Sequence, residues 1–502
     1  MAETPSRTVR FVDTTLRDGA QSLWASQMRT GIIEAVGPLL DEAGYLAVEV
    51  PMNPTFFKKF VRDMKEDPWQ MARVIAEVMP KSLKACMAGH TIDAFGPPPP
   101  PEMVQLFYGR LAQIGALNRV QVMSNTAGQI PTVFPWLIPF FKSVGFKVMM
   151  ALAFTISPRH TDAYYAAKAR EVAAFGPDGI YLKDQGGLLT PERVRTLLPA
   201  IMENAGGLPV EVHTHGTAGM SDAVYVEALK AGARVVHTGI PPLARGAAQP
   251  AIFDVLENLA YLGLEGQVDL ERVREVSRRL YAIAEEEGWP AGTTLAYDYG
   301  QYVHQVPGGV ISNLRHQLAE LGLQDRIREV LEEAARIRAE LGYPIMITPH
   351  SQFVVTQAAI NVAVGERWKV VIDELILFAQ GAFGEDSGYP WMDENLREKL
   401  LGLPRAKELQ DHAQRAPKAS VRALREELGG PDLSDEEFLL RYLMKGDREI
   451  RAMRAAGPPK RYRLLQPGPL VHLVETLSQA GEIGYVRVEN HGDVVVLARS
   501  GQ

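Results

Sequence analysis

Residues 9–18 read VRFVDTTLRD, a short apolar run that ends abruptly in aspartate, threonine and arginine. Residues 179–184 (GIYLKD) and 210–215 (VEVHTH) repeat this arrangement, with ionisable side chains directly after an apolar stretch. Strands that are apolar along their whole length are typical of parallel sheets, which helices cover on both faces. We therefore predict a parallel α/β fold in which these polar residues stand at the carboxyl ends of strands.

The same rhythm of strand and helix continues from residue 8 to about residue 265. Further strands are predicted at 45–50, 119–123, 146–152 and 234–237, and helices at 29–43, 164–175, 191–205 and 221–231. Alternation over roughly 250 residues is typical of a (β/α)8 TIM barrel, whose active sites lie at the carboxyl ends of the strands. An open doubly wound sheet is the competing architecture, but no Gly-x-Gly-x-x-Gly turn follows the first strand.

The character of the sequence changes twice beyond the barrel. Long charged helices are predicted at 270–287, 326–341 and 406–428, and strand patterns return after residue 461 as GYVRVEN, HGD and VVVLA, a predicted hairpin. We therefore expect a TIM-barrel domain over residues 1–290, a mainly helical domain over 291–460 and a small C-terminal β-containing extension over 461–502. Five consecutive prolines at 97–101 predict a rigid, extended connection.

Composition excludes several classes of protein. Of the 502 residues, 46% are hydrophobic and 23% charged, which is ordinary for a globular protein. The net charge of −7, with charges of both signs interspersed, argues against a nucleic-acid-binding protein. Cys86 is the one cysteine, so neither an internal disulfide nor a cysteine-cluster metal site is expected. No secretory signal and no apolar run of about 18 residues is found, which predicts a cytoplasmic protein that does not enter a membrane.

The strongest chemical signal is the pair His213 and His215. Side chains two apart on a strand point to the same side, so both imidazoles could bind one metal ion. Asp18, after the first strand, offers an oxygen ligand, and two nitrogens with one oxygen suit Zn²⁺, Mn²⁺ or Co²⁺ acting as a Lewis acid. The alternative is two histidines that face solvent or substrate without a metal.

Lys183 and Asp184 stand at the end of the strand predicted over 179–182. A lysine at the mouth of a barrel can form a Schiff base, carry a proton, or become an anionic metal ligand when CO₂ carbamylates it. The alternative is an ion pair between Lys183 and Asp184. Asp13 and Arg17 lie close enough to Asp18 to orient it or to form a structural ion pair.

Together these motifs resemble the carboxyltransferase family of pyruvate carboxylase, the oxaloacetate decarboxylase α subunit and the transcarboxylase 5S subunit. Residues 13–25 (DTTLRDGAQSLWA) are similar to the opening motif of the family, 182–184 (LKD) to its carbamylated-lysine motif and 213–219 (HTHGTAG) to its histidine motif. The resemblance continues through the helical region and covers about residues 8–455. It is carried there by 304–309 (HQVPGG), 312–314, 348–352 (TPHSQ), 357–362, 381–384 and 433–437.

The resemblance implies a TIM barrel followed by a dedicated helical domain, and a metal-dependent enzyme. It implies that Asp18, His213, His215 and carbamylated Lys183 bind a divalent metal, zinc or alternatively manganese or cobalt. Gln21 would line the substrate site and Arg17 would lie beside it, so that Lys183, Gln21 and Arg17 form the catalytic set. We also expect a homodimer.

Biotin is the first point at which the sequence departs from the family. Biotin is attached to a lysine, normally within Met-Lys-Met, but Lys460 is the last lysine and Lys445 lies in Leu-Met-Lys-Gly. We therefore expect biotin on a separate carrier protein, with biotin carboxylase also a separate chain.

The second departure concerns the pyruvate pocket. Residues 87–95 (MAGHTIDAF) align with the family stretch LRGANAVGY, so that Ala88 replaces an arginine and Phe95 a tyrosine. Residues 123–125 (MSN) align with FDS, and Ala247 replaces the threonine that would carry the enol proton. Loss of a bidentate carboxylate clamp leaves a buried anion unpaired. We therefore expect a substrate other than pyruvate, either a 2-oxo acid or an acyl-CoA, bound by Gln21, Ala88, Phe95, Ser124 and Ala247.

Three functions follow from these patterns. The leading hypothesis is a biotin-dependent carboxyltransferase or decarboxylase that moves CO₂ between carboxybiotin and a carbonyl-activated carbon through a metal-stabilised enolate. Another proton carrier would then be needed, with His90, Ser124, Asn125 and His237 as candidates. The first alternative is a metal-dependent aldol- or Claisen-type carbon–carbon lyase or synthase that uses no biotin. The second is a non-catalytic scaffold subunit. For residues 461–502 we expect docking of a partner.

Overall fold

The computed structural model describes residues 7–90, 99–126, 130–320, 322–415, 420–462, 485–490 and 493–498. Phe95 and the first two prolines of the run, Pro97 and Pro98, lie outside the described residues, as do the side chains of the C-terminal hairpin. The chain divides into two compact units, residues 1–460 and 461–502. No helix in the described parts of the chain is long and apolar enough to cross a membrane.

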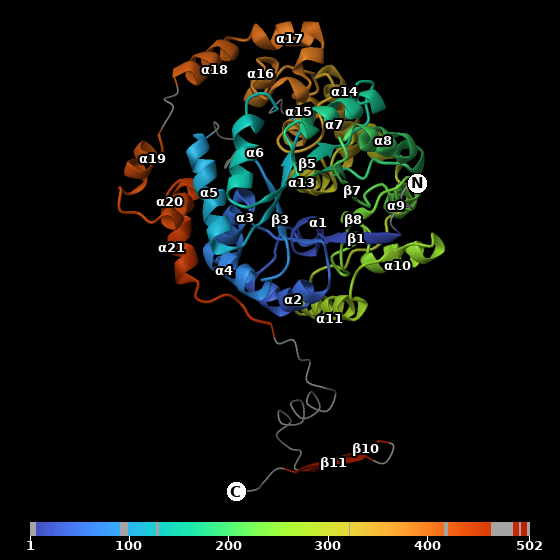
Figure 1. Cartoon of the computed structure of the whole chain (residues 1–502). Helices are drawn as coiled ribbons and strands as arrows, with labels where there is room; N and C mark the ends of the chain where they lie inside the picture. The colour runs from blue at the N-terminus through green and yellow to red at the C-terminus, as the bar shows by residue number, and fades with distance from the viewer. Residues whose placement is uncertain are drawn as a thin grey trace. The chain divides into compact units, whose positions relative to one another are not determined.

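Eight parallel strands close into the predicted TIM barrel (Figure 1). They are β1 (Thr8–Asp13), β2 (Ala47–Glu49), β3 (Lys84–Ala88), β4 (Arg119–Met123), β5 (Lys147–Ala153), β6 (Gly179–Asp184), β7 (Val210–Thr214) and β8 (Val235–Thr238). Each strand pairs with the next, and β1 pairs with both β8 and β2, which closes the ring. A short ninth strand, β9 (Glu265–Gly266), adds to the start of β1.

Seven of the eight barrel strands were predicted, and β3 was missed. Its sequence, KACMA, contains no β-branched or aromatic residue, so it lacks the composition that marks a strand. β3 is held in the barrel by its neighbours: Val48 of β2 pairs with Lys84, and Ala88 pairs with Val122 of β4. Tertiary pairing therefore decides this strand more than local preference does.

Helices surround the barrel, and several of them begin at recognisable N-caps. They are α1 (Ala20–Leu23), α2 (Thr30–Glu42), α3 (Pro54–Lys59), α4 (Pro68–Val78), α5 (Pro101–Ile114), α6 (Phe134–Ser143), α7 (Asp162–Ala173), α8 (Pro191–Asn204), α9 (Ser221–Lys230) and α10 (Ile252–Tyr261). Thr161 and Thr190 cap α7 and α8, each accepting a hydrogen bond from the backbone N–H three residues on. Two π-helical turns, Thr15–Gly19 and Phe60–Met64, interrupt this pattern, and the first of them follows β1.

The region beyond the barrel is helical, as predicted. It comprises α11 (Leu270–Glu287), α12 (Tyr299–His304), α13 (Gly308–Glu320), α14 (Ile327–Glu340), α15 (His350–Val364), α16 (Asp373–Ala379), α17 (Glu394–Leu401), α18 (Pro404–Arg415), α19 (Val421–Leu428), α20 (Asp435–Met444) and α21 (Arg448–Ala455), with 3-10 turns at Gln324–Arg326, Glu385–Ser387 and Tyr389–Trp391. Its core includes Leu341, Phe353, Phe378 and Leu400.

The single helix predicted over 406–428 is wrong. The segment contains two helices, α18 and α19, because Ser420 has an extended backbone and its side chain accepts a hydrogen bond from Ala423 N at the start of α19. The sequence also carries Pro417 in this interval, and proline disrupts the interior of a helix.

The end of the helical region packs back on the barrel. In Figure 1, α20 lies beside α5, and α20 also contacts α3. Glu436 of α20 forms ion pairs with Arg73 of α4 and Arg110 of α5, at 2.6 and 2.7 Å. These contacts explain why the barrel and the helices that follow it make one compact unit.

The C-terminal unit contains the predicted hairpin. β10 (Tyr485–Asn490) and β11 (Asp493–Ala498) are antiparallel, with Asn490 opposite Asp493 at the turn.

Candidate metal centre and active site

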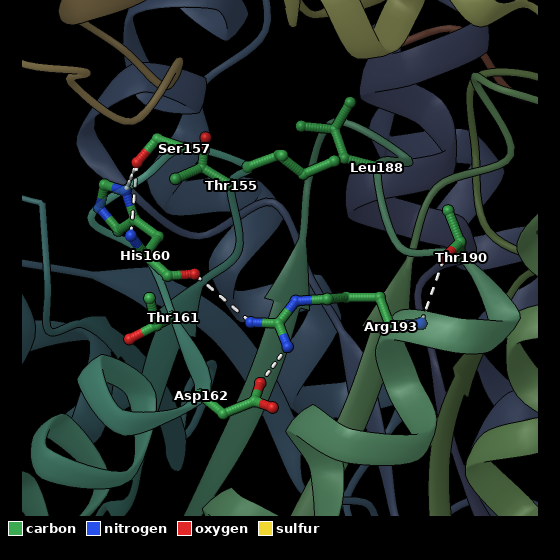
Figure 2. A pocket seen from close by; sticks show the side chains of 9 residues that line it. Thr155, Ser157, His160, Thr161, Asp162, Leu188, Thr190 and Arg193 are labelled. Carbon is green, nitrogen blue, oxygen red and sulfur yellow. Dashed lines mark hydrogen bonds and ion pairs between the residues drawn. The ribbon is translucent and has the colours of Figure 1, made fainter.

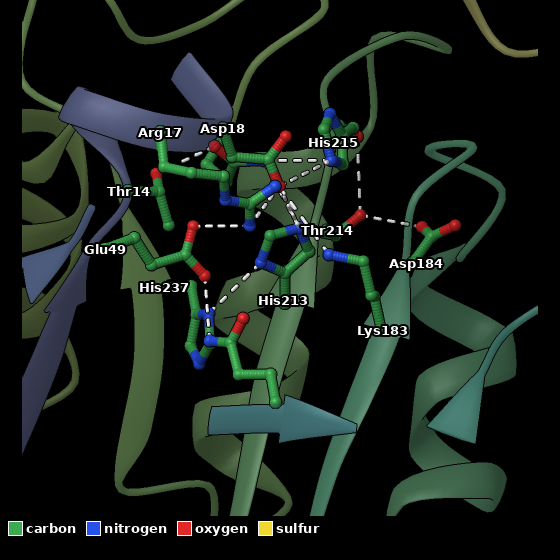
Figure 3. Close-up of polar contacts among 12 residues, drawn as sticks. Thr14, Arg17, Asp18, Glu49, Lys183, Asp184, His213, Thr214, His215 and His237 are labelled. Carbon is green, nitrogen blue, oxygen red and sulfur yellow. Dashed lines mark hydrogen bonds and ion pairs between the residues drawn. The ribbon is translucent and has the colours of Figure 1, made fainter. Parts of the chain in front are cut away.

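Four ionisable side chains meet at the carboxyl end of the barrel strands (Figure 3). Oδ2 of Asp18 lies 3.3 Å from Nε2 of His213, 3.5 Å from Nε2 of His215 and 3.6 Å from Nζ of Lys183. All four side chains are buried. Asp18, His213 and His215 also form the one group of three potential metal ligands found in the described residues. The sequence patterns that predicted these ligands thus point to residues that the fold brings together.

Asp18 is positioned by the π-helical turn after β1. Gly19 N donates to Thr14 O across this turn, at 3.0 Å. The turn packs against the loop after β8 so closely that a Cβ on Gly19 would lie 2.4 Å from the backbone oxygen of Leu243. Glycine is therefore required at position 19, and the turn holds Asp18 over the barrel.

The hydrogen bonds around the histidines test whether these residues suit a metal. His215 Nδ1 lies 2.6 Å from the Ala247 carbonyl, which can only accept, so Nδ1 carries the proton and the Nε2 lone pair is free to bind. The amide nitrogen of Gln249 lies 2.9 Å from His215 Nε2 and 3.3 Å from His213 Nε2. The two Nε2 lone pairs therefore converge on one point, as two ligands of one ion must.

The surroundings of Asp18 and Lys183 also bear on whether these residues suit a metal. Asp18 Oδ2 and Lys183 Nζ are buried and have no hydrogen-bond partner among the described residues. A buried polar atom that makes no hydrogen bond is costly, and a divalent cation would satisfy the Asp18 carboxylate in addition to its ion pair with Arg17. The donor set of two imidazole nitrogens and a carboxylate oxygen fits Zn²⁺, Mn²⁺ or Co²⁺.

The electrostatic environment favours the protonation states in which these groups can bind a metal. Burial raises the pKa of Asp18, but the surrounding positive charges, of which Arg17 at 3.0 Å contributes most, together outweigh it, so the pKa is held well below its usual range. Burial and the charge of Lys183 lower the pKa of His213, so its imidazole is neutral. Burial also lowers the pKa of Lys183, which makes its neutral amine more accessible.

Known proteins match the chain along most of its length. Residues 302–450 match the family model described as the conserved carboxylase domain, and residues 116–280 match the HMGL-like model. The 2-oxoglutarate carboxylase large subunit of Hydrogenobacter thermophilus is 31% identical over 481 residues, covering 93% of this chain and 71% of that protein. This chain belongs to the carboxyltransferase family of pyruvate carboxylase.

A second relative supports this membership, and a solved structure matches the fold. The carboxyltransferase is 33% identical over 380 residues to a pyruvate carboxylase subunit of Methanocaldococcus jannaschii, covering 75% of this chain and 66% of that protein. Its fold matches a solved structure of the carboxyl transferase domain of Rhizobium etli pyruvate carboxylase with pyruvate and biocytin, with a TM-score of 0.76 and 24% identity over 90% of this chain and 78% of that one.

Asp184 and Asp13 have hydrogen-bond partners other than those considered from the sequence. Asp184 accepts hydrogen bonds from Leu188 N, Leu189 N and the Thr214 hydroxyl, so it stabilises the loop after β6, while Lys183 faces Asp18. Asp13 accepts hydrogen bonds from the backbone N–H and the hydroxyl of Thr15. The ion pair proposed between Arg17 and Asp18 is present.

The described residues among those predicted to bind the substrate lie around the same end of the barrel. Ala88 ends β3, Ser124 follows β4, and Ala247 lies in the loop after β8. Ser124 is buried and its hydroxyl donates to Val122 O. Gln21, on α1, is exposed. Phe95 lies outside the described residues.

The candidate proton carriers differ in their surroundings. Asn125 is engaged with the backbone of Ala153 through both atoms of its amide, and His237 contacts His213 from below the metal cluster. His90 is partly buried, and burial lowers its pKa. Gln249 and Thr14 are site residues that the sequence did not identify. The Thr14 hydroxyl donates to Oε1 of Gln249 at 2.7 Å, which orients the amide toward the histidines.

A separate cavity of about 460 Å³ lies by the loops after β5 and β6 (Figure 2). It is lined by Thr155, Ile156, Ser157, His160, Thr161, Asp162, Leu188, Thr190 and Arg193. Its charged groups are paired with each other, Arg193 with Asp162, and the Ser157 hydroxyl lies 2.6 Å from His160 Nδ1. The cavity includes none of the four residues of the metal cluster.

Proposed function

We propose that this chain is the carboxyltransferase subunit of a biotin-dependent enzyme. It transfers CO₂ between carboxybiotin and a substrate carbon next to a carbonyl group, and the reverse direction would be a decarboxylation. The observation that carries this proposal is the convergence of Asp18, Lys183, His213 and His215 at the barrel mouth, in a chain that belongs to the carboxyltransferase family.

Asp18, His213, His215 and Lys183 would hold a divalent metal, with Zn²⁺ as our first choice and Mn²⁺ or Co²⁺ as alternatives. Such a metal acts as a Lewis acid that polarises the substrate carbonyl and stabilises the negative charge of an enolate oxygen. Around it, Arg17 keeps Asp18 ionised, and the Ala247 carbonyl keeps the proton of His215 on Nδ1.

Lys183 would act as a carbamate. Its neutral amine attacks CO₂, a bond forms between Nζ and carbon while one C=O π pair moves to oxygen, and the amine releases a proton to solvent, which leaves an anionic carbamate. The lowered pKa of the buried Lys183 and its lack of a hydrogen-bond partner support this reaction. The carbamate oxygens extend the lysine and add a negative ligand beside Asp18.

We propose a substrate other than pyruvate, with a larger 2-oxo acid as the first candidate and an acyl-CoA thioester as the second. Small side chains at Ala88 and Ala247, where the family has arginine and threonine, support a different pocket. The relative with the longest match among those described above is named a 2-oxoglutarate carboxylase. Gln21 and Arg17 would lie nearest the reacting groups.

The partners we propose are a biotin carrier protein and a biotin carboxylase on separate chains, together with a second copy of this chain as a homodimer. Both relatives reported above are named as subunits, which supports division of the activity among chains. The 42 residues after Lys460 contain no lysine, so this part of the chain offers no attachment point for biotin.

The test combines elemental analysis with turnover. The purified protein is analysed for metal and assayed with biotin or carboxybiotin against pyruvate, 2-oxoglutarate, oxaloacetate and acyl-CoA thioesters. We expect one metal per chain and biotin-dependent turnover that Asp18→Asn abolishes. Asp178→Asn, which removes a carboxylate at the opposite end of the barrel, should leave both unchanged, because Asp178 contacts Lys147 and Val148 N.

Other outcomes would favour the alternatives. Turnover without biotin would identify a carbon–carbon lyase or synthase, and a metal-free, inert protein would identify a scaffold subunit. Neither is favoured at present: the match to carboxylases extends through the helical region, and a scaffold has no need of the converging ligands. Preferential turnover of pyruvate would overturn the proposal for the substrate alone.

A further inference from the structure

A line of buried polar side chains runs inward from Asp18 and His213 into the barrel, and Figure 3 shows its first contact, between His213 and His237. His213 Nδ1 lies 3.1 Å from His237 Nδ1, and His237 Nε2 lies 3.0 Å from a carboxylate oxygen of Glu211. Arg119 Nη2 donates to both oxygens of Glu211, at 2.6 and 2.7 Å. None of these side chains is more than 4% exposed, so water cannot exchange for these partners.

The proton positions on His213 and His237 can be worked out from Glu211, the acceptor at the inner end of the line. The Glu211 carboxylate can only accept, so Nε2 of His237 must carry a proton and donate it. Arg119 already balances the charge of Glu211, so His237 is neutral and its Nδ1 has a lone pair. That lone pair must accept from His213, which places the His213 proton on Nδ1 and leaves Nε2 unprotonated.

The unprotonated Nε2 is the atom of His213 that faces Asp18. Were the hydrogen bond between the two histidines reversed, the His213 proton would lie on Nε2 and this nitrogen could not bind a metal. The direction of one buried hydrogen bond therefore decides whether His213 is a ligand.

We infer that Glu211 and His237 are positioning residues that fix the tautomer of His213 and present its Nε2 to the metal. This inference rests on the metal site of the proposed function. Partners that orient a ligating histidine in this way typically change metal affinity by about 10- to 100-fold when they are removed.

Two neighbours hold the line in place. The ring of Tyr181 stacks on His237, with centroids 5.3 Å apart and an angle of 13° between planes, which fixes the plane of the imidazole. The rings of His213 and His237 meet nearly at right angles, at 82°. Glu211 and His213 both belong to β7, two residues apart, so their side chains share the interior face of the barrel.

The experiment measures metal affinity rather than turnover. Metal-free wild-type protein and variants are titrated with Co²⁺ against a competing chelator, and the d–d absorption of bound Co²⁺ reports the ligand geometry. His237→Phe removes the acceptor for the His213 proton, and Glu211→Gln replaces the carboxylate by an amide that can also donate. We expect both to weaken Co²⁺ binding by about 10- to 100-fold and to alter the absorption.

His237→Asn is the conservative variant, since its Oδ1 can take the place of Nδ1 and accept from His213. We expect it to bind Co²⁺ within a few-fold of wild type, and Glu211→Gln keeps the inference testable if His237→Phe does not fold. Glu333→Gln is the matched control: Glu333 is a buried carboxylate paired with Arg367 and Asn361 in the helical region, so its loss costs stability but not metal affinity.

A purely structural role predicts a different result. Folded Glu211→Gln and His237→Phe would then have lower melting temperatures but wild-type Co²⁺ affinity and spectrum, and this outcome would overturn the inference while leaving the metal site in place. Absence of Co²⁺ and Zn²⁺ binding by the wild-type protein would overturn the inference and the proposed metal site together.

Discussion

Arg17 Nη2 lies 3.0 Å from Oδ2 of Asp18, and both side chains are buried at the mouth of the barrel. A second carboxylate, Glu49, lies 2.5 Å from the same nitrogen, so one guanidinium serves two acids. The arrangement keeps Asp18 ionised, and an ionised carboxylate is the form that binds a metal.

Replacing Arg17 should therefore change the pH at which metal binds. Without the guanidinium, the pKa of Asp18 rises, protons compete with the metal at higher pH, and the onset of metal binding moves upward in pH. Arg17→Met tests this in chelator competition from pH 5 to 9, with Arg17→Lys as the control that keeps a positive charge. An onset that does not move in Arg17→Met would contradict this role.

The variant should also be less stable. Arg17→Met leaves Asp18 and Glu49 without their shared partner, and loss of one member of a buried ion pair costs about 3–5 kcal/mol. Urea unfolding of the metal-free protein measures this cost, and Arg17→Lys should lose less.

Gly19→Ala should disturb the turn that carries Asp18. The added Cβ would lie 2.4 Å from Leu243 O, a backbone atom that cannot rotate away, and forced overpacking costs about 1–3 kcal/mol. Metal affinity should fall as well, because Asp18 moves with the turn. Gly109→Ala in α5 is the control: nothing lies within 4 Å of its added Cβ, and alanine in a helix is favoured over glycine by about 0.5–1 kcal/mol. Equal stability of the two variants would show that the turn tolerates a side chain at position 19.

Lys183 makes metal binding depend on CO₂ if it is carbamylated. We expect metal affinity to fall when bicarbonate and CO₂ are removed, and to fall in Lys183→Ala with partial recovery on addition of a short carboxylic acid such as acetate. Lys84→Met is the control, since Lys84 is also a buried lysine on a barrel strand but donates to Met79 O away from the cluster. Metal binding that is indifferent to bicarbonate would exclude the carbamate.

The sequence predicted the barrel and the approach of Asp18, Lys183, His213 and His215 to one another for a physical reason. Buried parallel strands have a distinctive composition, and their carboxyl ends meet on one side of the barrel, so polar residues at several strand ends must approach each other. Asp18, Lys183 and His213 lie on or directly after three such strands. Gln249 could not be found in this way, because it lies in an irregular loop whose path depends on packing.

The contacts among Arg119, Glu211 and His237 inside the barrel could not be predicted from the sequence either. His237 was considered only as a proton carrier, yet it lies beneath His213. Which strand residues share an interior layer depends on the stagger between strands, and a single sequence does not give it. Glu211 pairs with Arg119 across 92 residues of sequence, a separation at which local patterns carry no information.

His350 should make the stability of the helical region depend on acidity. Burial among the rings of Phe353, Phe378 and Phe383 lowers the pKa of His350 to about 4, against about 6.5 in an unfolded chain. Below pH 6.5, His350 is therefore protonated in the unfolded state, whereas in the folded state it stays neutral until about pH 4. The stabilising effect of the neutral imidazole is present above pH 6.5 and is lost as the pH falls from 6.5 to 4, by about 3 kcal/mol in all. Urea unfolding at pH 7.5 and pH 5 measures this loss, and His350→Gln should lose less stability than wild type between those two values because glutamine does not titrate. If both proteins lose the same free energy of unfolding over that interval, His350 is not the group that responds.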